Sequence, residues 1–297
     1  MKPIFDFNEV KVELLKKFDG KNNYFNCSSF DNKVIFRKEH KIEDKLLVSD
    51  VINDHNEILL EHYQDDQFYY SYEDARLIDN DNISVCVARF DVNDVTRLEN
   101  VAYKKYNIRT KKFYHFLTQR AHFEKHWQFY QNYIIYHVNP YTVFNENEEE
   151  IFVKHINWNP WIKLYGNPGL STNVFNVEGE KYILFHSYVN EGPHILKYYV
   201  GILKVDEDLQ PYGYCLTPLL ESNRSYTDEK LLNNLWKWRN TKYRNSVKYE
   251  VIFPMNVDVG SIYINIYAGL NDCSACILKL EKDKFIEKIK QEPFIIY

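Results

Sequence analysis

The chain has no apolar run of the roughly 18 residues that a membrane span needs, and Asp6 stands where a signal peptide would be apolar. Cysteine is scarce, with five residues spread widely through 297. An odd and scattered set does not form the framework of a disulfide-rich secreted domain. We therefore expect no membrane span and a cytoplasmic protein in a reducing compartment.

The chain also lacks an excess of positive charge. Its 37 Lys and Arg residues are outnumbered by 42 Asp and Glu residues, which gives a formal net charge of −5. Such a protein has no general attraction to polyanions, so nucleic acid is an unfavourable partner.

Motifs for nucleotides and metals are absent as well. No G-x-G-x-x-G or P-loop appears, and we interpret Asp79-Asn-Asp81 as a hairpin turn rather than a metal-binding D-x-D. Cys273 and Cys276 form a C-x-x-C, but no second Cys or His pair stands at zinc-ligand spacing. We expect no metal and no cofactor.

Aromatic residues, by contrast, are abundant, with 25 Tyr and 19 Phe. Tyr and Phe favour strands, and their faces also stack on sugar rings. A composition biased toward Tyr, Asn, Ile and Lys explains the same richness without a ligand. Aromatic content alone therefore fits an all-β fold with or without a glycan site.

Five short apolar strands recur along the chain, each after a turn and an earlier strand-like run. They are Val34–Arg37, Ile83–Phe90, Tyr133–Val138, Tyr182–Tyr188 and Ile262–Tyr267. The first four begin about 50 residues apart and the last interval is about 80, which is typical of propeller blades. No Gly/Ser-rich or Pro-rich linker divides the chain. We predict an all-β, five-bladed β-propeller that forms a single domain over residues 1–297.

Two segments show helical rather than strand spacing. Residues 226–247 predict a helical insertion before the last blade, which explains the longer interval, and 7–18 predict a short N-terminal helix. Thr227 or Asp228 can cap the insertion. Its large apolar side chains recur at helical spacing: Leu231, Leu232, Leu235, Trp236 and Trp238. We expect the Trp pair to pack rather than bind a ligand.

In a propeller the first strands of the blades surround a central channel, so polar side chains from distant segments meet there. The candidate first-strand segments are Asn26–Ser29, Tyr72–Arg76, Glu124–Trp127, Gly169–Thr172 and Phe253–Asn256. The second strands add Arg37, His137 and His186 near their ends. Polar residues at positions otherwise built for burial are candidates for function.

The most informative segment is Tyr72-Glu-Asp-Ala-Arg76. Side chains alternate along a strand, so Asp74 and Arg76 share one face while Glu73 points the other way. We expect Asp74 at the channel and Glu73 toward the blade interior or backbone. Asp74 beside Arg76 fits either a catalytic carboxylate or a structural ion pair, and spacing leaves both open.

Several motifs follow one another in order. They are Asn26-x-Ser-Ser, Ile35–Arg37, Tyr72–Arg76, Glu124–Phe129 leading to Tyr136–Pro140, His186, and Ile266–Asp272. This series resembles the β-propeller proteins of glycoside hydrolase family 130 and the related glycosyltransferase family 108. The chain departs from the pattern at Ala75, where the family has Pro, and at His137 and Asn139, where members often carry an Arg. The last departure weakens binding of inorganic phosphate.

The resemblance implies roles for particular residues. Asp74 is implied as the catalytic acid or base, and Arg37, Arg76 and His186 as ligands of an anion or sugar. The remaining implied sugar-binding residues are Asn26, Glu73, Lys125, His137 and Asp272.

Three classes of function remain open. The first, which we favour, is an inverting glycosyltransferase that adds a sugar from a nucleotide-sugar or sugar-phosphate donor to a glycan acceptor. The second is a phosphorylase or hydrolase of β-mannosides or similar sugars. Both pass through an oxocarbenium-like state and need a carboxylate that moves a proton. The third is a glycan-binding propeller without catalysis.

Overall fold

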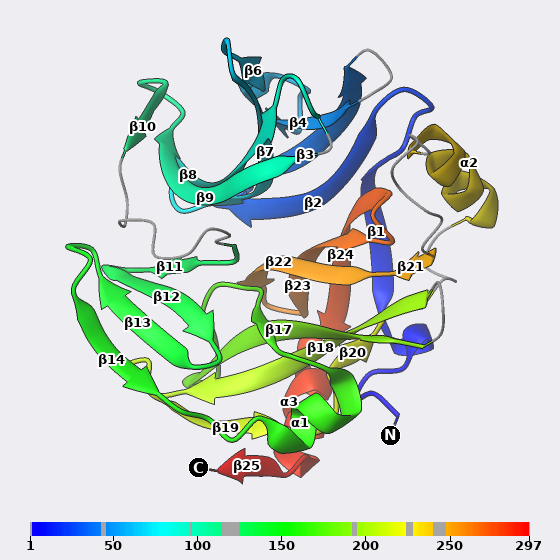
Figure 1. Ribbon diagram of the computed structural model, residues 1–297. Coiled ribbons are helices and arrows are strands. Elements are labelled where there is room, and N and C mark those ends of the chain that lie inside the picture. Colours follow the sequence, from blue (N-terminus) through cyan, green and yellow to red (C-terminus); the bar gives the residue numbers. More distant parts are fainter. Residues whose placement is uncertain are drawn as a thin grey trace.

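The structure is a computed structural model that describes residues 2–42, 46–95, 97–114, 125–191, 195–223, 228–239 and 248–296. Most of the regular structure in these residues is β-strand, as predicted, and the strands form five sheets. Figure 1 shows the sheets in a propeller-like arrangement, with α2 at its edge.

Sheets one and two come from the N-terminal part of the chain. The first sheet has the order β2 (Asn23–Phe30), β3 (Lys33–Ile42), β4 (Leu46–Asn53), β5 (Ile58–Leu60). The second has the order β10 (Lys112–Tyr114), β9 (Leu98–Asn107), β8 (Asn82–Asp91), β7 (Phe68–Leu77), β6 (Tyr63–Gln64).

Sheets three and four follow along the chain. The third has the order β11 (Gln128–Tyr130), β12 (Tyr133–Val138), β13 (Tyr141–Asn145), β14 (Glu150–Lys154). The fourth contains β15 (Gly169–Leu170), β16 (Phe175–Val177), β17 (Glu180–Asn190), β18 (Ile195–Val205), β19 (Pro211–Cys215), β20 (Leu220–Glu221), β21 (Lys248–Glu250) and β25 (Phe294–Ile296).

The fifth sheet joins the two ends of the chain. Its order is β22 (Ile252–Val259), β23 (Tyr263–Leu270), β24 (Ser274–Glu281), β1 (Lys11–Lys17). Each of the five predicted apolar runs lies in a different sheet. Four of them lie within β3, β8, β12 and β17, and the last, Ile262–Tyr267, overlaps β23 from Tyr263 onward. The predicted hairpin pattern is therefore confirmed.

Consecutive residues of these five strands enter different hydrophobic clusters. On β3, Ile35 packs toward the second sheet and Phe36 toward the fifth. On β12, Ile134 joins a cluster with the second sheet and Ile135 one with the fourth. The same division holds for Val85/Cys86, Ile183/Leu184 and Ile266/Tyr267. Because both faces of each sheet are covered, these strands read as continuous apolar runs.

The predicted N-terminal helix is wrong. Only Phe7–Glu9 form a 3-10 turn, η1, and Lys11–Lys17 form β1. β1 pairs antiparallel with β24, and Val12 packs against the core. Backbone pairing with the exposed edge of β24 outweighs the helical spacing of the apolar residues, because tertiary contacts override weak local propensity.

The helical insertion is confirmed where the chain is described. α2 spans Glu229–Arg239, and Asp228 Oδ1 accepts the Lys230 backbone N–H at 2.7 Å. Trp238 packs against Phe18, with ring centroids 5.2 Å apart. The flanking residues 224–227 and 240–247 and the Trp236 side chain lie outside the described part. Two further helices were not predicted: α1 (Asn159–Tyr165) and α3 (Lys282–Gln291). Among the described residues, none of the helices has the length and apolarity to cross a membrane.

We expect Phe5→Ala to lower the free energy of unfolding by about 3–5 kcal/mol, as for other buried Phe truncations. Phe5 is 1% exposed, faces Phe285 of α3, and belongs to the cluster joining the fourth and fifth sheets. Urea unfolding measures the change. Phe30→Ala, at a 38% exposed residue, is the control and should cost about 1 kcal/mol or less. Equal losses in the two variants would contradict docking of the N-terminal segment.

Candidate functional site

Asp74 lies where β7 breaks its alternation. The pairing of β7 with β8 shifts register between Glu73 and Arg76, and Asp74 has φ 48°. Asp and Asn enter this left-handed region more readily than most residues, and one residue there is enough to form a bulge. Because the bulge changes the alternation, Asp74 and Arg76 do not form the expected pair.

Asn26 repeats this geometry on the neighbouring sheet. It has φ 49° at a register shift in β2, and its Nδ2 donates to Asp74 Oδ1 at 2.7 Å. Gly269 on β23 leaves the space for Asn26, because a Cβ at Gly269 would lie 2.0 Å from Asn26 Oδ1. Three sheets thus position the Asp74 carboxylate.

Arg37 and Lys125 surround the adjacent carboxylate. Arg37 Nη2 lies 3.1 Å from Glu73 Oε1 and its Nη1 lies 3.7 Å from Asp74 Oδ1. Lys125 Nζ lies 3.0 Å from Glu73 Oε2. Glu73 therefore bridges two cations on the same side as Asp74, and its expected orientation toward the blade interior is wrong. The coulombic effect of Glu73 raises the pKa of Lys125 above its usual value.

The charge cluster continues into residues that the sequence did not suggest. Arg37 Nη2 lies 3.7 Å from Glu39, whose other oxygen lies 2.8 Å from Arg239 Nη2. Arg239 Nη1 in turn lies 3.3 Å from Asp272. Burial alone would lower the pKa of Arg37, but Glu73, Glu39 and Asp74 raise it above its usual value. Glu39 shares the face of Arg37 by strand alternation and could have been found. Arg239, from a distant helix, could not.

Arg76 lies in a second group of contacts. Its Nε donates to the Met255 carbonyl at 3.3 Å and its Nη2 to the Ser171 carbonyl at 3.0 Å. Within the described residues its Nη1 is buried without a hydrogen-bond partner, and no carboxylate lies within ion-pair distance. The guanidinium is thus fixed by backbone carbonyls and keeps an unused donor.

His186 lies beside Arg76 as a neutral imidazole. Its Nδ1 is 2.7 Å from Ser171 Oγ, and its ring is 4.7 Å from the Phe253 ring. Burial and then the charge of Arg76 lower the pKa of His186 to about 3. Burial and then His186 hold the pKa of neighbouring His126 well below its usual value. These two rings and Phe253 form an uncharged surface next to a cation.

The nine predicted site residues therefore fall into two groups and two outliers. Arg37, Glu73 and Lys125 cluster with Asp74 and Asn26, whereas Arg76 and His186 meet at Ser171. His137 is exposed, and Asp272 contacts Arg239 rather than Asp74. Glu124 of the quoted motif lies outside the described residues.

This cluster suits hydroxyl groups and anions better than a metal ion. Both carboxylate oxygens of Glu73 and of Glu39 already contact Arg or Lys side chains, so Asp74 Oδ2 alone offers too few oxygens for a hard cation. Cys273 and Cys276 are both buried, and burial raises the pKa of the Cys276 thiol well above its usual value. A neutral buried thiol is a poor metal ligand.

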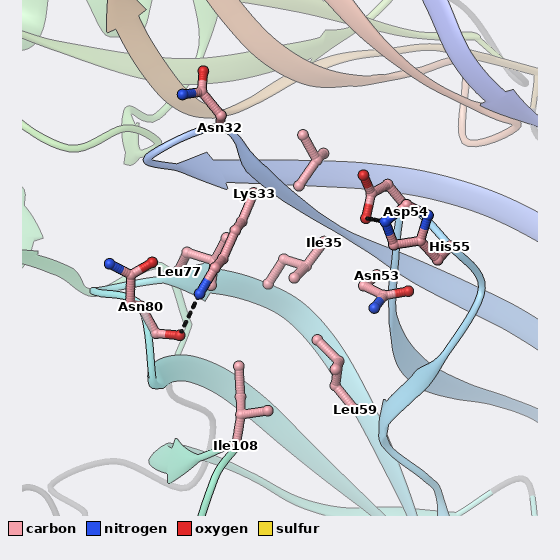
Figure 2. Close-up of a pocket in the computed structure, with 11 residues that line it drawn as sticks. Asn32, Lys33, Ile35, Asn53, Asp54, His55, Leu59, Leu77, Asn80 and Ile108 are labelled. Atoms are coloured by element: carbon pink, nitrogen blue, oxygen red, sulfur yellow. Dashed lines mark hydrogen bonds and ion pairs between the residues drawn. The ribbon is translucent and has the colours of Figure 1, made fainter.

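A separate cavity of about 380 Å³ lies between the first and second sheets (Figure 2). Its apolar wall includes Ile35, Leu77 and Ile108, and Lys33 Nζ donates to the Asn80 carbonyl at 3.3 Å across it. None of the predicted site residues lines this cavity, so it is not the candidate site.

Solved structures resemble the chain along most of its length. No protein-family profile and no curated protein sequence matches. A mannose phosphorylase from Leishmania mexicana in complex with phosphate ion is 11% identical, with 95% of this chain and 92% of that chain covered and a TM-score of 0.57. A beta-1,2-mannobiose phosphorylase from Listeria innocua is 12% identical, with 98% and 95% covered and a TM-score of 0.56. A GDP-Man-dependent mannosyltransferase from Leishmania mexicana is 12% identical, with 91% and 89% covered and a TM-score of 0.55.

The chain has a similar fold to these proteins. At such low identity the likeness concerns fold alone, and it supports at that level the resemblance inferred from the motifs.

Gly269→Ala tests how Asn26 is positioned. The added methyl group would meet Asn26 Oδ1, so we expect a loss of about 1–3 kcal/mol in the free energy of unfolding, as for other overpacked sites. In an Asn26→Ala background the same change should cost much less, because the clashing carboxamide is gone. A double-mutant cycle by denaturant unfolding measures this coupling. Additive losses would show that the two residues do not interact.

His186 should make stability depend on acid pH. Its folded pKa of about 3 lies below the unfolded value near 6.5, so the unfolded state binds the extra proton as pH falls from about 6.5 to 3. Stability from this group is therefore present above pH 6.5 and is lost on acidification. His186→Asn keeps a partner for Ser171 and should reduce the slope by up to about 1.4 kcal/mol per pH unit. Unfolding measured from pH 7 to 4 checks this, and an unchanged slope would contradict it.

Proposed function

We propose that the chain is a carbohydrate-active enzyme that transfers a glycosyl group from an activated donor to a glycan acceptor. In this proposal the five sheets are five blades of one propeller domain, and the donor is a nucleotide sugar or sugar phosphate. Asp74 is the catalytic residue and removes the proton from the acceptor hydroxyl. Support comes from the geometry around Asp74 and from the fold shared with mannose-acting enzymes.

The observation that carries the proposal is the asymmetry of the Asp74 carboxylate. Asn26 Nδ2 and Arg37 Nη1 both contact Oδ1, at 2.7 and 3.7 Å. Among the described residues no hydrogen bond reaches Oδ2, although Asp74 is only 5% exposed. An anchored carboxylate with one oxygen left for the substrate is the arrangement that positioned proton transfer requires.

The group around Arg76 supplies what a departing anionic group needs. Arg76 is fixed by two carbonyls and keeps Nη1 for a ligand oxygen. Preorganised donors of this kind stabilise charge that develops in a transition state. The Phe253 and neutral His186 rings offer an uncharged surface for a sugar face. Arg76 and His186 are therefore proposed donor or sugar ligands, together with Arg37, Asn26, Glu73, Lys125 and the more distant His137 and Asp272.

Phosphorolysis or hydrolysis of a mannoside-type sugar is the second candidate. The unpartnered Arg76 Nη1 favours it, because an inorganic phosphate oxygen fits that donor as well as a donor phosphate does. Arg37 and Lys125 are less suited to phosphate, since Glu73 already lies 3.1 and 3.0 Å from them. This pairing is why we place glycosyl transfer first.

Asp74→Asn should lower turnover by about 10²–10⁴-fold, the usual worth of positioned proton transfer. Asn also adopts positive φ readily, so the bulge and the fold should survive. Turnover is measured with GDP-mannose and mannosides as donors. Mannobiose plus phosphate is the substrate pair that tests phosphorolysis, the second candidate. Thermal stability and ligand binding are measured on the same samples.

The matched control is Asp208→Asn at an exposed turn, which should leave turnover unchanged. Protection against heating by GDP-mannose supports transfer, whereas protection by phosphate or mannobiose supports the second candidate. Full activity of the Asp74→Asn protein would remove Asp74 from the mechanism. Sugar binding without turnover of any donor by the unaltered protein would favour a binding propeller.

A further inference from the structure

On the first sheet, away from Asp74, three potential metal ligands converge. His40 lies on β3, Asp50 on β4, and His62 between β5 and β6. One ligand atom from each lies within 4.8 Å of the other two. We propose that these residues form a site for a divalent transition-metal ion, with Zn²⁺ as the ion of choice.

Strand alternation brings the three together on one face. Lys38 pairs with Asp50 across β3 and β4, so His40, two residues beyond Lys38, projects from the same face as Asp50. Arg37 and Glu39 project from the opposite face, into the charge cluster beside Asp74. The metal site and the candidate active site therefore use opposite faces of β3.

The distances are close to those of a coordinated ion. His40 Nδ1 lies 3.5 Å from Asp50 Oδ2, and His62 Nδ1 lies 2.7 Å from Asp50 Oδ1. Bonds of about 2.0–2.1 Å in a tetrahedron place neighbouring ligand atoms about 3.3–3.4 Å apart. The His40 pair is within about 0.2 Å of that separation, and the His62 pair, which uses the other Asp50 oxygen, has to widen by about 0.6–0.7 Å.

The three side chains do not satisfy one another's hydrogen bonds completely, which leaves a place for a bound ion. His40 Nδ1 is buried and has no hydrogen-bond partner among the described residues. Asp50 is buried, and its Oδ1 also accepts the His62 backbone N–H at 2.8 Å, which fixes the third ligand's segment before any ion binds. A metal ion would satisfy the unused nitrogen of His40.

The donor set and the opening select the kind of ion. Two imidazole nitrogens and one carboxylate suit Zn²⁺ and its transition-metal neighbours rather than Mg²⁺ or Ca²⁺, which prefer oxygen. The three residues line a cavity of about 480 Å³, which gives the ion a path in and room for water at a fourth position. Lys21, Lys38, Lys41 and Glu61 also line the cavity. The three lysines outnumber the one glutamate, and this positive charge disfavours ions held by charge alone and favours an anionic fourth ligand.

The test titrates the chelator-treated full chain with Zn²⁺ against a chromophoric chelator, and in parallel with Co²⁺ as a spectroscopic probe. We expect one ion per chain and Co²⁺ absorption bands typical of a four-coordinate nitrogen and oxygen site. His40→Gln and His62→Gln should each weaken Zn²⁺ binding by more than about 100-fold, because loss of a residue that only supports a ligand already costs about 10–100-fold. Asp50 is left unchanged because it is buried and anchors His62.

His55→Gln is the matched control. His55 is the same residue type, is 80% exposed, and lines the other cavity, so its loss should leave Zn²⁺ affinity unchanged. Circular dichroism checks that each variant is folded. If the unaltered chain does not bind Zn²⁺ or does not give the Co²⁺ bands, that result alone overturns the proposal. Equal affinity in the His40→Gln, His55→Gln and unaltered proteins would overturn it as well.

Discussion

The hydrogen bond from Asn26 to Asp74 is the contact on which the geometry of the candidate site depends. It joins two residues with φ near 50°, each at a break in its own strand. It also requires Gly269 on a third sheet, where any larger residue would occupy the position of the Asn26 carboxamide. A strained backbone that is held from three sides is characteristic of functional sites rather than of ordinary strand pairing.

Next to this contact, cationic and anionic side chains alternate along a chain of ion pairs. Lys125, Glu73, Arg37, Glu39 and Arg239 follow one another with neighbours at 2.8 to 3.7 Å. Both Arg37 and Arg239 lie over the Phe25 ring, at 4.6 and 5.3 Å. Removal of one member of a buried pair usually costs about 3–5 kcal/mol, since its partner keeps an uncompensated charge. The alternation therefore fixes the positions of the site's cations while its net charge stays small.

Elsewhere in the sheets the strands keep a regular alternation of side chains, unlike the strands at Asn26 and Asp74. Neighbouring residues such as Ile134 and Ile135 enter clusters on the two sides of one sheet, and each sheet is thereby packed between two others. Regular alternation builds this rigid frame. The register shifts at Asn26 and Asp74 then turn polar groups out of it at one place.

Much of the fold could be predicted from the sequence, because apolar strand runs, turns and the spacing of hairpins are local properties. The grouping of Asn26, Arg37 and Lys125 with Asp74 was implied only by the resemblance of the motifs, and Glu73 joins them against its expected orientation. The N-terminal segment could not be predicted correctly, since its strand exists only through pairing with β24 at the other end of the chain. Likewise the separation of Asp74 from Arg76 depends on a bulge that no spacing rule records. The partners of Arg76 and the His40, Asp50 and His62 cluster also required the tertiary structure, because they join atoms from different strands and sheets whose distances local sequence does not determine.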